Sequence, residues 1–106
     1  MILYINTSDS TKTIVGLEKD GKKFLLSEKT GKQKSQNVLP LIKKLLEKHN
    51  ASPQKLTDLI VNTGPGSFTG LRIGVAIANT LGYILSIPVN KKKIVEPVYS
   101  KSKFDY

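Results

Sequence analysis

The residues best suited to chemistry lie in one short stretch, Asn62 to Gly74, which has the sequence NTGPGSFTGLRIG and follows an apolar run. A glycine-rich turn between a strand and a helix can hold a phosphate with its backbone N–H groups. A Walker loop ends in Gly-Lys-Ser/Thr, but here Gly70 is followed by Leu71, and Thr69 stands where a dinucleotide fingerprint needs glycine. We therefore favour a packing role for these glycines and keep phosphate binding as the minor alternative.

Other candidate catalytic groups are equally incomplete. Ser67 lacks the flanking glycines of a nucleophile elbow, because Pro65 and Thr69 occupy those positions. Its place before a helical pattern predicts a helix N-cap instead. His49, the single histidine, ends a lysine-rich segment and has no carboxylate beside it to orient it as a base. The acidic residues are scattered, so we expect no catalytic residue, no metal site and no cofactor, and interpret the chain as a binding module.

Small residues recur every four positions after the turn at Gly64, and on a helix this spacing makes one ridge without side-chain bulk. The ridge consists of Gly66, Gly70, Gly74, Ala78 and Gly82. Glycine inside a helix costs about 1 kcal/mol relative to alanine, so the pattern predicts that another element approaches this helix closely. We expect the ridge to lie against the sheet and against the first helix.

Arg72 is the most informative single charge. A cation near a helix N-terminus opposes the helix dipole, so this position is more favourable when an acidic group of a partner meets it. Extension of the side chain into solvent is the alternative.

Two helices and several short strands must position these residues. Short β-prone runs, an Asp20-Gly21 turn and apolar residues at spacings of three and four support this interpretation. The strands are expected at residues 2–6, 13–18, 23–27, 56–63 and 87–89, and the helices at 35–49 and 67–86. The first three strands are expected to be antiparallel and the last two parallel, with a right-handed crossover. The predicted fold is an α/β domain with a mixed sheet of about five strands and two main helices.

Both helices have more apolar surface than one contact requires. The helix at 35–49 carries an apolar stripe two rows wide, which indicates either a second partner or a helix that uses both rows in the core. The helix at 67–86 is apolar nearly all round and leaves one polar side for water or a partner. That side carries Thr69, Arg72, Ala76, Asn79, Thr80 and Tyr83.

The 106 residues suit one small domain, and we place it at residues 1–90, followed by a basic, partly disordered tail at 91–106. Seventeen Lys and Arg against eight Asp and Glu give a formal net charge of +9, which favours either polyanions such as RNA or simply a lysine-rich, solvated surface. There is no cysteine, no signal-peptide pattern and no apolar run near the roughly 18 residues of a spanning helix. We expect a cytoplasmic protein without membrane contact.

The string NTGPGSFTGLRIGVAIANTLGYILSIPV closely resembles the signature of the TsaB (YeaZ) family, inactive relatives of the TsaD proteins within the actin-like ATPase (ribonuclease H-like) fold. ILYINTSDSTKTIVGL, KSQNVLPLIKKLLEKHN and VEPVYSKS are also similar to family segments. The resemblance implies a single actin-like lobe, because the usual second lobe would fall between residues 87–89 and 96–99. Asn6 stands where the family usually has aspartate and Lys34 where it commonly has histidine, and both departures weaken any implied ATP binding.

The resemblance further implies a non-catalytic partner of a TsaD-like enzyme in forming threonylcarbamoyladenosine beside the tRNA anticodon, with a TsaE-like ATPase and tRNA in the complex. The family pairs through the two helices, here 35–49 and 67–86, in a four-helix bundle. The expected partner-binding residues are Leu41, Leu45, Arg72, Ile73, Ala76, Thr80 and Tyr83, and the expected structural ones are Gly64, Gly66, Ser67, Gly70 and Gly74. The alternatives are a stand-alone basic tRNA-binding protein, a glycoprotease-like hydrolase, and a homodimer formed in isolation through the same helices.

Overall fold

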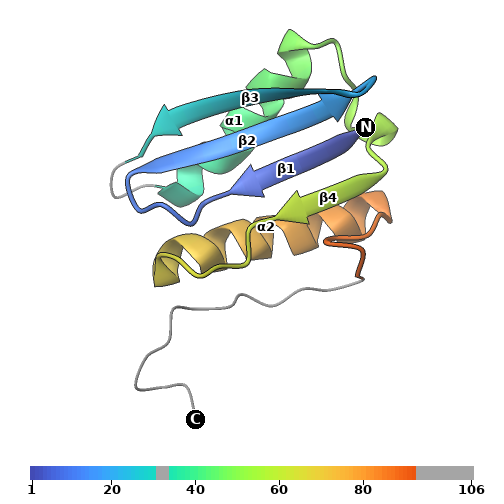
Figure 1. Cartoon of the computed structure of the whole chain (residues 1–106). Helices are drawn as coiled ribbons and strands as arrows, with labels where there is room; N and C mark the ends of the chain where they lie inside the picture. The colour runs from blue at the N-terminus through green and yellow to red at the C-terminus, as the bar shows by residue number, and fades with distance from the viewer. Residues whose placement is uncertain (31–33, 93–106) are drawn as a thin grey trace.

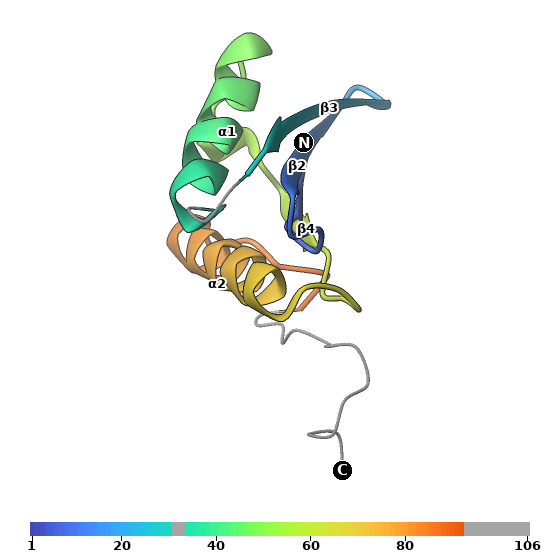
Figure 2. The ribbon, with the colours of Figure 1, turned by 90° about the vertical axis from the view of Figure 1, so that its left-hand side faces the viewer.

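The computed structural model describes residues 1–30 and 34–92. Four strands form one mixed sheet in the order β3-β2-β1-β4, and both helices lie on the same face of it (Figures 1 and 2). The elements are β1 (Ile2–Asn6), β2 (Lys12–Lys19), β3 (Lys22–Lys29), α1 (Lys34–Lys48), the 3₁₀ turn η1 (Pro53–Lys55), β4 (Asp58–Val61) and α2 (Phe68–Leu85). The predicted tail lies outside the described residues from position 93 onward.

The antiparallel part of the sheet follows from local sequence signals. β2 and β3 are joined by Asp20 and Gly21, whose φ angles of 53° and 77° are those of a two-residue turn of the kind that suits strand twist. β1 pairs antiparallel with β2 and parallel with β4. The three predicted antiparallel strands are therefore confirmed.

The expected fifth strand is reduced to a single bridge. Val89 makes one parallel bridge to Leu59 and one antiparallel bridge to Lys92, so the sheet has four strands among the described residues. Asn90 replaces part of the missing ladder: its side-chain Oδ1 accepts from the Val61 N–H at 2.8 Å and its Nδ2 donates to the Val61 carbonyl at 3.0 Å. A two-residue return at residues 90–91, both with positive φ, turns the chain away before a ladder can form.

Both helices form where the apolar periodicity predicts them. α1 runs over 15 residues with Pro40 inside it and covers β2 and β3, whereas α2 runs over 18 residues along β1 and β4. By length and composition alone α2 could cross a membrane, with a mean hydropathy of 1.3, and in this structure one side of it packs on β1 and β4.

The core lies between the sheet and the two helices. Its fully buried side chains include Leu3 and Leu17 from the sheet and Leu71 from α2. Leu41 and Leu45 belong to this core as well, since they are only 2% and 1% exposed. They were expected to face a partner, and that expectation is wrong, because the row of α1 that contains them covers β2 and β3.

Candidate partner-binding surface

The turn before α2 is built as the sequence predicts. Gly64 has a φ of 112°, a conformation that glycine adopts without steric cost, and its peptide bond to Pro65 is cis. Ser67 is the N-cap of α2, because its Oγ accepts from the Gly70 N–H at 3.3 Å. The expected roles of Gly64 and Ser67 are confirmed.

The small-residue ridge of α2 lies against the end of β1 and the residues that follow it. A Cβ on Gly66 would come within 2.7 Å of the Ser8 Cβ, and one on Gly70 or Gly74 would collide with Thr7. Further along, Gly82 faces Val89. The ridge therefore packs on the sheet and on residues 7–8 and 89. α2 also contacts α1.

Thr7 is the residue against which Gly70 and Gly74 of the ridge pack, and the sequence did not predict this contact. Its side chain is fully buried, and its Oγ1 donates to the Gly70 carbonyl at 2.5 Å. A buried hydroxyl needs such an acceptor, since an unpaired one costs about 1–3 kcal/mol. The only sequence signal was a small polar residue directly after β1.

The polar side chains at the ends of β1 and β4 bond to one another. The Asn6 Oδ1 accepts from the Ser8 N–H at 3.0 Å, from the Ser8 hydroxyl at 2.7 Å and from the Asn62 amide at 3.3 Å. The Asn62 Oδ1 accepts from the Gly64 N–H at 2.8 Å. These groups hold the glycine turn in place, which supports the packing role of this stretch over the phosphate cradle.

The outer side of α2 is exposed as predicted. Arg72, Ala76 and Thr80 form an i, i+4, i+8 row that is open to solvent, and Ile73 beside them is half-buried. Tyr83 is 86% exposed, the largest exposure among the large hydrophobic side chains that the structure describes. The Arg72 guanidinium lies 5.5 Å from the centre of the Phe68 ring, at a distance where a cation is attracted to an aromatic face.

An apolar groove runs between α1 and α2. Its volume is about 440 Å³, and most of its lining is aliphatic. Leu39 on α1 and Leu81 and Leu85 on α2 form its two sides, with Lys43 and Glu47 at one rim. Leu39 is 50% exposed, so α1 presents this one large apolar side chain outward, whereas Leu41 and Leu45 are buried.

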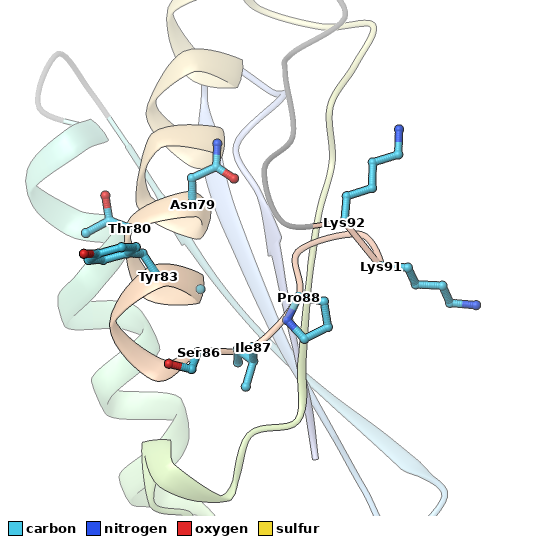
Figure 3. A pocket seen from close by; sticks show the side chains of 9 residues that line it. Asn79, Thr80, Tyr83, Ser86, Ile87, Pro88, Lys91 and Lys92 are labelled. Carbon is cyan, nitrogen blue, oxygen red and sulfur yellow. The ribbon is translucent and has the colours of Figure 1, made fainter.

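A second hollow, of about 920 Å³, lies at the C-terminal end of α2. Figure 3 shows its two sides, the last turns of α2 on one and residues 87–92 on the other. Tyr83, Ile87 and Pro88 provide apolar surface, and Lys91 and Lys92 provide positive charge. The hollow suits a partner segment that carries apolar side chains and carboxylates. Sequence analysis did not single it out, because it exists only where the chain turns back beside the helix.

Metal-binding groups are not gathered anywhere in residues 1–30 and 34–92: no three His, Asp or Glu side chains lie close enough to hold an ion. His49 stacks on Phe24, with ring centres 4.3 Å apart, and its carbonyl accepts from the Lys19 Nζ at 3.2 Å. The histidine is thus a contact between the end of α1 and the β2–β3 hairpin.

Known proteins match both the sequence and the fold. The family model described as TsaD, tRNA N6-adenosine threonylcarbamoyltransferase, matches residues 25–91. The protein called tRNA threonylcarbamoyladenosine biosynthesis protein TsaB is 34% identical in Bacillus subtilis and 33% identical in Escherichia coli, over 96% and 83% of this chain. The chain belongs to the TsaD/TsaB (YeaZ) family.

Solved structures of this TsaB/YeaZ family share the fold. YeaZ from Pseudomonas aeruginosa superposes with a TM-score of 0.78 at 24% identity, over 94% of this chain and 43% of that one. A protein described as similar to the peptidase YEAZ from the same organism superposes with a TM-score of 0.79 at 26% identity, over 90% of this chain and 42% of that one. This confirms the actin-like lobe that the sequence resemblance implied. The chain spans less than half the length of the curated TsaB proteins, covering 44% and 38% of the two named above.

Proposed function

We propose that this chain is a non-catalytic partner of a TsaD-like enzyme in the formation of tRNA threonylcarbamoyladenosine. The observation that carries the proposal is the distribution of exposed large hydrophobic side chains. Of the five among the described residues, four lie on the two helices: Leu39 on α1, and Phe68, Tyr83 and Ile84 on α2. Apolar side chains that gather on one face of a folded domain mark a protein contact.

The shape of this face fits the helices of another protein. The groove between α1 and α2 is lined mostly by aliphatic side chains, so it can accept apolar side chains from a helix of another protein. Ile84, which is 66% exposed, stands beside the groove residue Leu85. A partner helix laid into the groove would therefore also bury Ile84.

Arg72 favours a partner that carries a negative charge at the contact. It projects from the first turns of α2, where a cation opposes the helix dipole, and an acidic group on the partner would offset that cost. We expect the TsaD-like partner to place a carboxylate opposite Arg72. The names of the relatives, which are tRNA threonylcarbamoyladenosine biosynthesis proteins, support this choice of pathway, and the match to the TsaD family model supports a TsaD-related partner.

Size-exclusion chromatography of the chain mixed with its cognate TsaD homologue tests the proposal. We expect a single earlier peak that contains both proteins at equal molar amounts. Separate monomer peaks at micromolar concentrations would refute the partnership. A TsaE-like ATPase and tRNA are proposed as further members of the complex, to be added in a second step of the same experiment.

A stand-alone tRNA-binding role is the second candidate, because the chain carries a net charge of +9. This role predicts that the chain binds tRNA in the absence of TsaD. The affinity should fall steeply as the salt concentration rises, since phosphate contacts release counterions. The proposed partnership predicts instead a complex with TsaD that persists at high salt and weak tRNA binding by the chain alone. A glycoprotease-like hydrolase is the less favoured alternative, and cleavage of a glycoprotein by the purified chain would support it.

Self-association through the same helix face is expected when no partner is present, since an uncovered apolar surface pairs with a copy of itself. Addition of the TsaD homologue should then convert homodimer into heterodimer. If the homodimer persisted when the TsaD homologue was bound, the self-contact and the TsaD contact would lie on different faces of the domain.

A further inference from the structure

The two outer strands of the sheet differ in what lies beside them. Residues 87–92 lie along β4, where the Leu59 N–H donates to the Pro88 carbonyl at 3.0 Å and the Asn90 N–H donates to the Leu59 carbonyl at 2.8 Å. β3 forms the other border of the sheet (Figure 1) and has a neighbouring strand on one side only. Its eight residues therefore present a strand edge that no other strand among the described residues pairs with.

The register of the β2–β3 hairpin shows which backbone groups point to this edge. Thr30 and Thr11 continue the pairing of the two strands, and the Thr30 N–H donates to the Thr11 carbonyl at 2.8 Å. Because hydrogen-bonded and non-hydrogen-bonded pairs alternate along an antiparallel ladder, the even-numbered residues of β3 bond to β2. The odd-numbered residues direct their N–H and C=O groups outward. They are Lys23, Leu25, Ser27 and Lys29.

Leu25 lies in the middle of this edge. Its side chain is 64% exposed, and it is the only exposed large hydrophobic residue outside the two helices among the described residues. A lysine on an edge strand often keeps other strands away. Lys23, however, lies over its own sheet, because its Nζ is 3.7 Å from the centre of the Tyr4 ring. The middle of the edge is therefore apolar and open to a further strand.

A second copy of β3 matches this edge in one antiparallel register. In that register Leu25 faces Leu25 of the copy, so the outward backbone groups of both strands meet. Lys22 then lies opposite Glu28, and Phe24 lies opposite Leu26, and each of these two pairs occurs twice. Opposite charges and apolar side chains that face each other across two strands stabilise a sheet.

The neighbouring registers lose this match. A shift of two residues is the smallest that still pairs the outward backbone groups, because every second residue points outward. In one direction this shift places Lys23 opposite Lys29, and like charges directly opposite each other are destabilising. In the other direction it places Lys23 opposite Leu25. In the matching register Lys29 faces Gly21, which has no side chain.

We propose that two copies of this chain pair antiparallel along β3, across a two-fold axis at Leu25, so that the sheet of one copy continues into the sheet of the other. The contact uses the same residues on both copies, as two-fold symmetry requires. Lys22 and Glu28 set its register and Leu25 fills its centre. The contact lies at the edge of the sheet, so it is separate from the helix face and does not depend on the proposed function.

Analytical ultracentrifugation of the full chain carrying Ile84→Glu tests the proposal, since this change places a charge on the helix face and leaves β3 intact. We expect a dimer. Lys22→Glu or Glu28→Lys, added singly, places like charges opposite each other twice, so each should weaken the dimer by about tenfold or more. The two changes together restore opposite charges, so the double variant should regain dimerisation. Both side chains are exposed, and neither has an opposite charge across from it on β2.

Disulfide trapping in the same Ile84→Glu chain reports the register. The chain has no cysteine, so Leu25→Cys can form a disulfide only with the same position of another copy. In the proposed register the two Cα atoms are about 5.5 Å apart, a distance that a disulfide spans. Ser27→Cys is the matched control, because it is exposed on the same strand but lies roughly 14 Å from its counterpart in the copy. We expect at least about tenfold more disulfide at position 25.

Three results would overturn the proposal. The first is an Ile84→Glu chain that stays monomeric up to roughly millimolar concentration. The second is a dimer that the single charge changes leave intact, or that the double change does not restore. The third is equal cross-linking at positions 25 and 27. The TsaD contact is measured separately, so it can fail or succeed without affecting these results.

Discussion

Ser67, Gly70 and Gly74 set where α2 begins and how near it lies to β1. Ser67 caps the helix, and the two glycines leave room for Thr7, whose hydroxyl bonds back to Gly70. The cap and the glycines are predictable because each depends on local geometry. Thr7 is not, since its role depends on a helix more than 60 positions later in the chain.

Gly70→Ala should destabilise the domain by about 2 kcal/mol or more, even though alanine improves helix propensity by about 1 kcal/mol. The new Cβ collides with the Thr7 carbonyl oxygen, which is backbone and cannot rotate away. Urea denaturation measures the change. Thr69→Ala, one residue away on the exposed side, is the control and should shift stability by less than about 0.5 kcal/mol. Equal midpoints for the two variants would refute the close contact.

Ser67→Ala should cost about 1 kcal/mol, because the Gly70 N–H loses its acceptor. Ser67→Asp retains an acceptor and adds a negative charge at the helix N-terminus, so it should keep the stability of the parent chain. Thermal unfolding by circular dichroism distinguishes the two. If both variants lost the same amount, the hydroxyl would not be acting as a cap.

At the level of elements, periodicity predicts which residues of a helix are apolar but not which apolar row faces its own sheet. α1 has two such rows, and the row of Leu41 and Leu45 is buried while Leu39 stays exposed. The choice depends on how α1 lies on β2 and β3, which are distant from it in sequence, so no short window of sequence contains it. In the same way, the hairpin turn at Asp20 and Gly21 was predictable and the replacement of the fifth strand by one bridge was not.

Asn90→Gly should release residues 87–92 from β4 without backbone strain, since Asn90 has a φ of 50° that glycine adopts freely. The Val61 amide then loses its acceptor, so its hydrogen exchange should accelerate by at least about tenfold. Exchange measured by NMR reports this directly, with the Leu17 amide in the centre of the sheet as an internal control. An unchanged Val61 rate would mean that backbone pairing alone holds this edge.

For the whole molecule, the two faces of the sheet differ in whether helices cover them and in where exposed apolar side chains lie. One is covered by helices that carry four of the five exposed large hydrophobic side chains among the described residues, and the other is open and carries the fifth, Leu25. The fold class and the family were accessible from the sequence, because the glycine-rich string is specific and the strand and helix patterns are regular. Which face is open became visible only in three dimensions.

The central claim is that the helix side of the domain binds a TsaD-like protein. Isothermal titration with the cognate TsaD homologue tests it most directly, by comparing Ile84→Glu with Leu25→Glu. The two residues are 66% and 64% exposed, so neither change should affect folding much, but they lie on opposite faces. We predict that Ile84→Glu weakens binding by about 30-fold or more, as expected for a charge buried in a contact, and that Leu25→Glu leaves it unchanged. Equal affinities for the two variants, or a loss confined to Leu25→Glu, would contradict the account.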